Sequence, residues 1–308
     1  MNHASTPRGS GQGGPPASGL DPVVRAAAMM IGASALLAMT SLLAKALGRG
    51  VEGPALHPLQ ISAGRFCFAL IAITVVAAWM RPTFTRVSWP LHGGRSLCGW
   101  LGVTCTFAAA ARMPLSDATA ISFLSPIVTM VLAVLLLSER VGPVRWSAAA
   151  VSLIGAVVLI RPGTSAFQPA ALIALSAALF MGVELILIKW LTAAERPLQI
   201  LLVNNSIGAV ISVSAAVFVW TAPAPAQWAM LVLLGLIMAS AQALFIQAVK
   251  GVDASYIVPF FYSTLVFAAF YDVLLFGDRP DALGLVGAII IVAGAVLLAW
   301  REGRRRHT

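Results

Sequence analysis

Apolar stretches of roughly twenty residues recur along the chain, and this recurrence most constrains the fold. A transmembrane helix needs about 20 mostly apolar residues to cross the hydrocarbon core. Because lipid offers no hydrogen bonds to an open backbone, each stretch is predicted to be helical. The sequence therefore predicts an all-α membrane protein with ten transmembrane helices. They are expected at 24–46, 59–80, 94–111, 116–138, 144–160, 168–190, 198–220, 227–249, 254–276 and 282–300.

The composition excludes several other classes of protein. Of the 308 residues, 59% are hydrophobic and 10% are charged, whereas soluble domains carry about 25% charged residues. A soluble enzyme and a disordered chain are therefore excluded. The net charge of +9 does not indicate a nucleic-acid partner, because the basic residues lie between the apolar stretches and at the C-terminus. The expected surroundings are the lipid bilayer.

The distribution of Lys and Arg predicts the orientation in the membrane. With the N-terminus in the cytoplasm, 14 of the 20 basic residues fall on the cytoplasmic side, 5 on the opposite side, and Arg65 within a span. This bias follows the positive-inside rule. We expect a multi-pass protein of the bacterial inner membrane with both termini in the cytoplasm. Residues 1–22 are predicted to be a disordered cytoplasmic tail without a cleaved signal peptide, and residues 302–308 a basic cytoplasmic tail.

The sequence partly matches itself after a shift of 139 residues. Pro58–Ile61 falls on Pro197–Ile200, and Gly155–Val157 falls on Gly294–Val296. Two five-helix repeats are therefore predicted, at 23–163 and 164–301. Because five is an odd number, the second repeat enters the membrane from the opposite side. Such inverted repeats are typical of secondary transporters, which bind their substrate near the midplane and work by alternating access.

Three segments resemble a known family. Asp117–Pro126 and Leu135–Arg140 resemble the first-repeat signature of the EamA family, within the drug/metabolite transporter superfamily, and Gly155–Gly163 is also typical of it. The second repeat departs from the pattern. Leu265 falls at the position of Pro126, and Asp278 replaces the usual glutamate.

The resemblance implies a central cavity and transport of a small organic solute. Many bacterial members export amino acids, including aromatic ones, and others take up S-adenosylmethionine or move sugars. The leading interpretation is an exporter of aromatic or hydrophobic amino acids, similar to the aromatic amino acid exporters. The alternative is uptake of S-adenosylmethionine or a related metabolite.

No enzyme activity, cofactor or metal is expected. The chain has no Gly-rich phosphate loop, so direct use of ATP is not expected. It has no cluster of His and Cys, and the four histidines, His92 among them, are assigned to tails or loops. The cysteines have no metal-binding spacing.

An ionisable residue within a membrane span costs free energy, so each one is a candidate for a functional role. Arg65 lies about 10 Å below the outer edge, and Asp272 lies at a similar depth. They are interpreted either as a structural ion pair or, for Arg65, as a group that attracts a substrate carboxylate. Glu184 is interpreted as a proton carrier or an amine-binding group, or as a polar contact to another helix.

Uncharged side chains within the spans complete the predicted site, although each could instead serve helix packing. Asn204 is the repeat counterpart of Arg65, and Gln242 lies near the middle of its span. Trp100 lies deeper than an interfacial tryptophan, and the Tyr262 hydroxyl needs a partner. The predicted substrate-binding residues are Arg65, Trp100, Glu184, Asn204, Gln242 and Tyr262, and the predicted kinks or hinges are Pro126 and Pro259.

The orientation is tested by a reporter that is active only outside the cytoplasm. Fused after Arg301, it is expected to give no signal, because the basic bias places the C-terminus in the cytoplasm. The activity of the fusion is measured in intact cells, with its level of expression as the control. A strong signal would contradict the ten-span topology.

Overall fold

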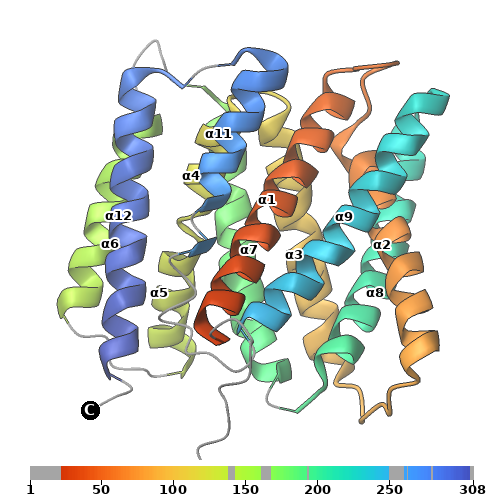
Figure 1. The fold of residues 1–308 in the computed structure, drawn as a ribbon, viewed down its shortest axis with the longest axis horizontal. Helices are drawn as coiled ribbons and strands as arrows, with labels where there is room; N and C mark the ends of the chain where they lie inside the picture. Colours follow the sequence, from red (N-terminus) through yellow and green to blue (C-terminus); the bar gives the residue numbers. More distant parts are fainter. Residues whose placement is uncertain are drawn as a thin grey trace, which may run out of the picture.

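The computed structural model describes residues 22–137, 143–160, 168–192, 194–249, 260–261, 263–278 and 280–305. Within these ranges every regular element is a helix (Figure 1). This confirms the all-helical class. The elements are α1 (Pro22–Gly48), α2 (Pro58–Met80), α3 (Trp89–Ala110), α4 (Leu115–Ser122), α5 (Ser125–Leu137), α6 (Pro143–Ile160), α7 (Ala170–Thr192), α8 (Pro197–Ala216), the 3-10 turn η1 (Val217–Val219), α9 (Pro225–Val249), α11 (Ser263–Phe276) and α12 (Ala282–Arg305).

Proline sets where many of the helices begin. Pro22, Pro58, Pro143, Pro197 and Pro225 are each the first residue of a helix. The proline ring fixes a helical φ, and a helix lacks a partner for its first N–H groups in any case, so proline costs nothing there. These prolines therefore define where the apolar helices begin.

Six helical stretches are long and apolar enough to cross a membrane, judged by length and composition. Three shorter apolar helices accompany them, and α3 falls in neither group. The six stretches are Val24–Gly48, Pro58–Met80, Leu115–Leu136, Ala170–Ile188, Pro197–Val219 and Pro225–Phe245.

The expected fourth span, 116–138, is interrupted. Helix α4 ends at Ser122 and α5 begins at Ser125, with Phe123 and Leu124 between them. Pro126 is the second residue of α5, where its missing N–H breaks no helical bond of α5 itself. The interruption therefore lies directly before the proline, and the use of Pro126 as a hinge stays a prediction.

The packing partners of the helices come in two corresponding sets. Helix α1 packs on α9 and α11, and α7 packs on α3 and α5. The shift of 139 residues relates α3 to α9 and α5 to α11. Helix α2 packs on its own counterpart α8, and α6 packs on its counterpart α12 (Figure 1).

The backbones of α6 and α12 approach each other closely. A Cβ atom added to Gly155 would lie 2.7 Å from the backbone N of Ile291 and 2.8 Å from the backbone O of Gly287. Ser152 donates a hydrogen bond to the carbonyl O of Ile291 at 3.3 Å. Small residues thus let the two helices touch, as is common between membrane helices.

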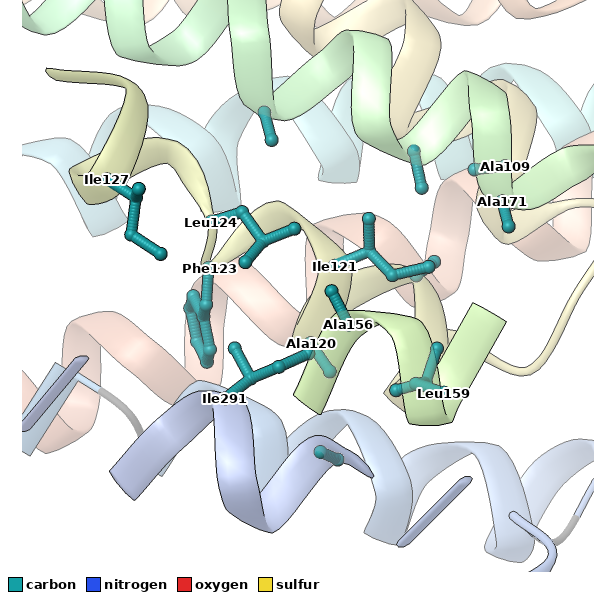
Figure 2. Packing of buried hydrophobic residues seen from close by; sticks show 14 of the residues in the cluster. Ala109, Ala120, Ile121, Phe123, Leu124, Ile127, Ala156, Leu159, Ala171 and Ile291 are labelled. Atoms are coloured by element: carbon teal, nitrogen blue, oxygen red, sulfur yellow. The ribbon is translucent and has the colours of Figure 1, made fainter. Parts of the chain in front are cut away.

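A buried apolar cluster joins this pair to the interrupted fourth span. Phe123 and Leu124, at the interruption, lie beside Ala156 of α6 and Ile291 of α12 (Figure 2). Ala174 and Ala178 of α7 belong to the same cluster. The break between α4 and α5 is therefore held by packing from three other helices.

Replacing Gly155 by alanine is expected to destabilise the protein. The new methyl group would meet backbone atoms that have no rotamer to adopt, which costs about 1–3 kcal/mol as overpacking does elsewhere. The matched control is Gly93→Ala in α3, where an added Cβ meets nothing within 4 Å and helix propensity favours alanine by up to about 1 kcal/mol. Thermal unfolding of both variants in detergent is the measurement. A Gly155→Ala variant as stable as Gly93→Ala would contradict the close contact.

Candidate functional site

A cluster of charged residues ties the end of α1 to α11. Lys45 is fully buried and donates to Asp272, and it also donates to Asp278 at 2.8 Å. The other Asp272 oxygen accepts the backbone N–H of Leu115 at 2.6 Å. Arg49 reaches the same Asp278 oxygen at 2.8 Å. The buried charges of this cluster are thus fully paired, which identifies it as a structural link between α1, α4 and α11.

The predicted pairing of Arg65 with Asp272 is wrong. Asp272 takes Lys45 as its cation, and Arg65 forms no ion pair among the described residues. Similar depth places two side chains at one level of the membrane, but it leaves their angular positions around the bundle open. Lys45 was counted with the interfacial residues, although its ammonium group lies wholly inside the protein.

Asp278, in the loop after α11, remains ionised in this cluster. Burial alone would raise the pKa of its carboxyl group. Hydrogen bonds and charge from Lys45 and Arg49 outweigh burial, so the pKa lies below its ordinary value. The stabilisation from this carboxylate is therefore present above its unfolded pKa and is lost as the pH falls through the lower, folded one.

A second polar region lies where α2, α3, α7 and α8 meet. Arg65 of α2 is buried, Arg95 of α3 is buried, and Glu184 of α7 keeps 19% of its side chain exposed. The Glu184 carboxylate lies 3.7 Å from Arg95 Nε and acts electrostatically on both arginines. Arg95 Nη1 donates to the carbonyl O of Ile200 on α8 at 3.2 Å. Asn204, one helix turn beyond Ile200, accepts a hydrogen bond from Ser96 of α3. The structure thus brings Arg65, Glu184 and Asn204 to one junction of four helices.

Glu184 reaches this junction because α3 carries a glycine opposite it. A Cβ atom at Gly99 would lie 2.8 Å from Glu184 Oε1. Ser96, nearly one turn earlier on α3, donates to Asn204 Oδ1 at 3.1 Å. Gly99 and Ser96 are therefore small residues on the face of α3 toward α7 and α8, and they leave room for the charged and amide groups.

Several buried polar atoms near the bundle interior have no hydrogen-bond partner within the described ranges. They include Nε and Nη1 of Arg65, Nε of Arg95, Nε1 of Trp100 and Oε1 of Gln242. The Arg65 guanidinium stacks on the neighbouring Phe66 ring, 4.2 Å from its centroid. An unpaired buried polar group costs free energy, so a concentration of them indicates groups kept for a ligand or for water.

Three of the residues predicted for the site hold such atoms, namely Arg65, Trp100 and Gln242. Trp100 lies on α3 beside Gly99. Gln242 lies on α9, which packs on α1 and α2. Tyr262 and Pro259 lie outside the described residues.

A polar network at the end of the bundle where α3 and α8 begin was not predicted. Glu195 Oε2 lies 2.8 Å from His92 Nε2 and accepts from Gln199 at 2.7 Å, and Glu195 Oε1 accepts the backbone N–H of Ser88 at 2.9 Å. Burial alone would raise the pKa of Glu195, but the hydrogen bonds from His92, Ser88 and Gln199 lower it below its ordinary value. The network therefore holds an ionised carboxylate between two loops.

The assignment of His92 to a loop is wrong, and Arg95 was missed as an interior residue. Helix α3 begins at Trp89, five residues before the expected start at 94, so His92 falls inside the helix. Arg95 lay at the start of the expected span, but its side chain is buried, as is that of His92. Without the buried Arg95 and Lys45, the basic residues still divide 13 against 4. The signal for the earlier start is Ser88, the N-cap residue, followed by a proline within the first two helical positions.

A pocket of about 370 Å³ opens at the other end of the bundle. The ends of α1 and α3, the α1–α2 loop and Val219 and Thr221 line it. It is separate from the buried charges around Glu184. Among the described residues no group of three or more His, Cys, Asp or Glu side chains suits a metal ion.

The apolar helices and the buried charges between them define a helical membrane protein. Two consecutive segments, residues 24–161 and 168–300, match the family model of the EamA-like transporter family. The chain therefore belongs to this family of membrane transporters, as the signature residues of the first repeat predicted.

Curated relatives are named as transporters of different solutes. An S-adenosylmethionine uptake transporter of Rickettsia prowazekii is 28% identical over 81% of this chain and 85% of its own length. A riboflavin transporter of Rhizobium johnstonii is 32% identical over 70% of this chain and 72% of its own length. A pseudopaline exporter of Pseudomonas aeruginosa is 25% identical over 70% of this chain and 76% of its own length.

A crystal structure shares the fold. It is 22% identical in sequence and has a TM-score of 0.61, over 91% of this chain and 99% of that one.

The buried pair Lys45–Asp272 is expected to be costly to break from one side. Lys45→Met leaves the Asp272 carboxylate buried without its cation, and we expect a loss of about 3–5 kcal/mol of stability. The double variant Lys45→Met/Asp272→Asn removes both charges and keeps an acceptor for the Leu115 N–H, so it should recover part of the loss. Chemical or thermal unfolding in detergent measures both.

Arg49→Met is the matched control, because its ion pair with Asp278 is about one-third exposed and such pairs contribute about 1 kcal/mol or less. A Lys45→Met variant that is no less stable than Arg49→Met would show that breaking the buried pair costs no more stability than breaking the exposed one.

Proposed function

We propose that this protein is a secondary transporter that moves a small organic metabolite across the bacterial inner membrane by alternating access. It does so without ATP, a cofactor or enzyme chemistry. The observation that carries the proposal is the group of unpaired polar atoms where α2, α3, α7 and α8 meet. A bundle that served only as a scaffold gains nothing from leaving two nitrogens of the buried Arg65 guanidinium without a partner among the described residues, whereas a carrier must leave its site unpaired until the substrate arrives.

The proposed architecture has ten transmembrane helices in two inverted repeats, 23–163 and 164–301, with both termini in the cytoplasm. The corresponding packing sets of α1 and α7 support it. So does the Ser152–Ile291 bond, because these residues are 139 apart, the repeat shift itself. A contact between a residue and its own counterpart is what a two-fold axis between α6 and α12 predicts.

Two glutamines give the sharpest support for the inverted relation. Gln60 of α2 accepts the Thr221 N–H at 3.1 Å and donates to the Thr221 carbonyl at 2.7 Å. Its counterpart Gln199 of α8 accepts the Thr85 N–H at 2.7 Å and donates to the Thr85 carbonyl at 3.1 Å. Each threonine lies four residues before the first residue of the next helix, Trp89 or Pro225.

Each glutamine thus clamps a loop of the other repeat, one at each end of the bundle (Figure 1). An arrangement that repeats at opposite ends is the geometry that alternating access requires, because opening one end and closing the other then uses equivalent parts.

We propose two candidate classes of substrate. The first is an aromatic or hydrophobic amino acid, exported from the cell. Trp100 offers an apolar face for its side chain, and Arg65 and Glu184 offer opposite charges for its ends. The second is S-adenosylmethionine or a related metabolite, taken up into the cell, which the names of the Rickettsia relatives favour. Both solutes carry the ammonium and carboxylate groups of an α-amino acid.

Transport by proteoliposomes of purified protein tests the proposal. Saturable uptake with counterflow of a radiolabelled amino acid or S-adenosylmethionine is expected for the wild type. Trp100→Ala should weaken affinity about 5- to 150-fold, through lost stacking and buried area of about 1–3 kcal/mol. Gln242→Ala is expected to weaken it as well.

Trp79→Ala is the matched control, because Trp79 lies at a helix end with 86% of its surface exposed. Wild-type affinity and rate in both Trp100→Ala and Gln242→Ala would remove these residues from the site. Flux without saturation or counterflow would contradict a carrier mechanism.

A further inference from the structure

We propose that Arg65, Arg95 and Glu184 together bind the α-ammonium and α-carboxylate groups of the substrate, so that the transported solutes are compounds with a free α-amino acid head. This inference rests on the proposed function and narrows it. Arg65, with support from Arg95, binds the carboxylate, and Glu184 binds the ammonium group.

The first support is that the charges of this cluster are close but incompletely paired. The Glu184 carboxylate is 3.7 Å from Arg95 Nε, which is too long for a hydrogen bond, and Arg95 Nε has no other partner in the described part of the chain. The fully paired Lys45–Asp272 cluster shows that this protein closes a buried ion pair where the pair is structural. The open pair at Glu184 therefore indicates a different use.

The second support is Arg65. Arg65 is 3% exposed, and Nε and Nη1 of its guanidinium have no hydrogen-bond partner among the described residues. Hydrogen bonds from a guanidinium to a carboxylate are charge-assisted and strong. Two buried donors without a partner on this cation therefore call for an acceptor from a ligand, and a carboxylate is the acceptor that suits them.

The third support is the combination of signs. A simple organic anion would satisfy Arg65 but would compete with Glu184 for the arginines. A simple amine would satisfy Glu184 and leave the Arg65 donors empty. In an α-amino acid the ammonium and carboxylate groups are attached to the same carbon atom, so both fit a site in which a carboxylate and guanidinium groups lie side by side. Such a ligand leaves the net charge of the buried cluster unchanged, which avoids an additional buried charge.

Glu184 keeps 19% of its side chain exposed, while Arg95 beside it is 6% exposed. The carboxylate is therefore the more accessible group of this pair.

The test is a binding experiment with a matched set of ligands on the purified full-length protein. The amino acid, or S-adenosylmethionine, that most raises the melting temperature serves as the parent. It is compared with its carboxamide, which lacks the carboxylate charge, and with its deaminated acid, which lacks the ammonium group. Because hydrogen bonds to charged groups are strong, each analogue should bind wild type about 10- to 100-fold more weakly.

The variants assign each group to a residue. In Arg65→Gln the parent and its carboxamide should bind equally weakly, while the preference for the ammonium group persists. In Glu184→Gln the parent and its deaminated acid should bind alike, while the preference for the carboxylate persists. Arg65→Lys keeps the charge without the planar fork and should fall between wild type and Arg65→Gln. Arg86→Gln and Glu52→Gln, both at exposed loop positions, are the matched controls and should keep both preferences.

Melting temperatures without ligand report whether each variant folds. If Arg65→Gln does not fold, the ligand preferences of Glu184→Gln alone decide the test. Equal binding of the parent and either analogue by wild type overturns the inference, as does a wild type that no α-amino acid stabilises. So does a Glu184→Gln variant that still distinguishes the parent from its deaminated acid. Saturable counterflow of a solute without an amino acid head would overturn the inference but leave the carrier function standing, whereas absence of counterflow for every solute would overturn the function itself.

Discussion

A membrane interior offers no water to a polar group, so each polar group inside the bundle must find its partner in the protein. The ends of the bundle follow this rule closely. Lys45 has two carboxylates, and Glu195 has a histidine, an amide and a backbone N–H. His92 Nδ1, beside Glu195, also lacks a partner within the described ranges, but the unpaired donors of Arg65 and Arg95 belong to buried cations. These donors indicate a function because the same chain gives another buried cation, Lys45, two carboxylate partners.

The polar links at the ends explain how loops without regular structure are held. Gln60 and Gln199 each use both atoms of one amide to bind both backbone atoms of one residue, which gives a loop two of the bonds that a strand or helix would supply. Gln227, at the start of α9, similarly donates to the Pro54 carbonyl at 2.8 Å. In the proposed inverted repeat, equivalent residues act at opposite faces of the membrane, and the loops at both faces are fixed by side chains from the other repeat.

The sequence predicted the all-helical class and the positions of most helices well, because a membrane span is recognised by its length and apolar composition alone. The side-chain pairing was predicted poorly. The Arg65–Asp272 pair failed because depth along a helix says nothing about which neighbour a side chain faces. His92 was missed because the start of α3 was taken from the apolar run, whereas the helix begins five residues earlier, at Trp89. Arg95 was missed because it was counted with the basic residues of the cytoplasmic side, although its side chain is buried. Trp100 and Gln242, chosen for depth alone, do carry unpaired atoms, since depth decides whether water is present.

The proposed substrate head also explains why the buried arginines of the first repeat have no counterparts in the second. Shifted by 139 residues, Arg65 corresponds to Asn204 and Arg95 to Leu234, so the charges are not duplicated. The clamps at the ends keep the same residue, glutamine, in both repeats. Equivalent gates need equivalent residues, because the two end states of alternating access are alike. A solute with an anionic and a cationic end has no two-fold symmetry, and a symmetric site would offer it four arginines and bury an excess of charge. Divergence at the centre and identity at the ends therefore follow from one requirement, which is that a symmetric scaffold carries an asymmetric solute.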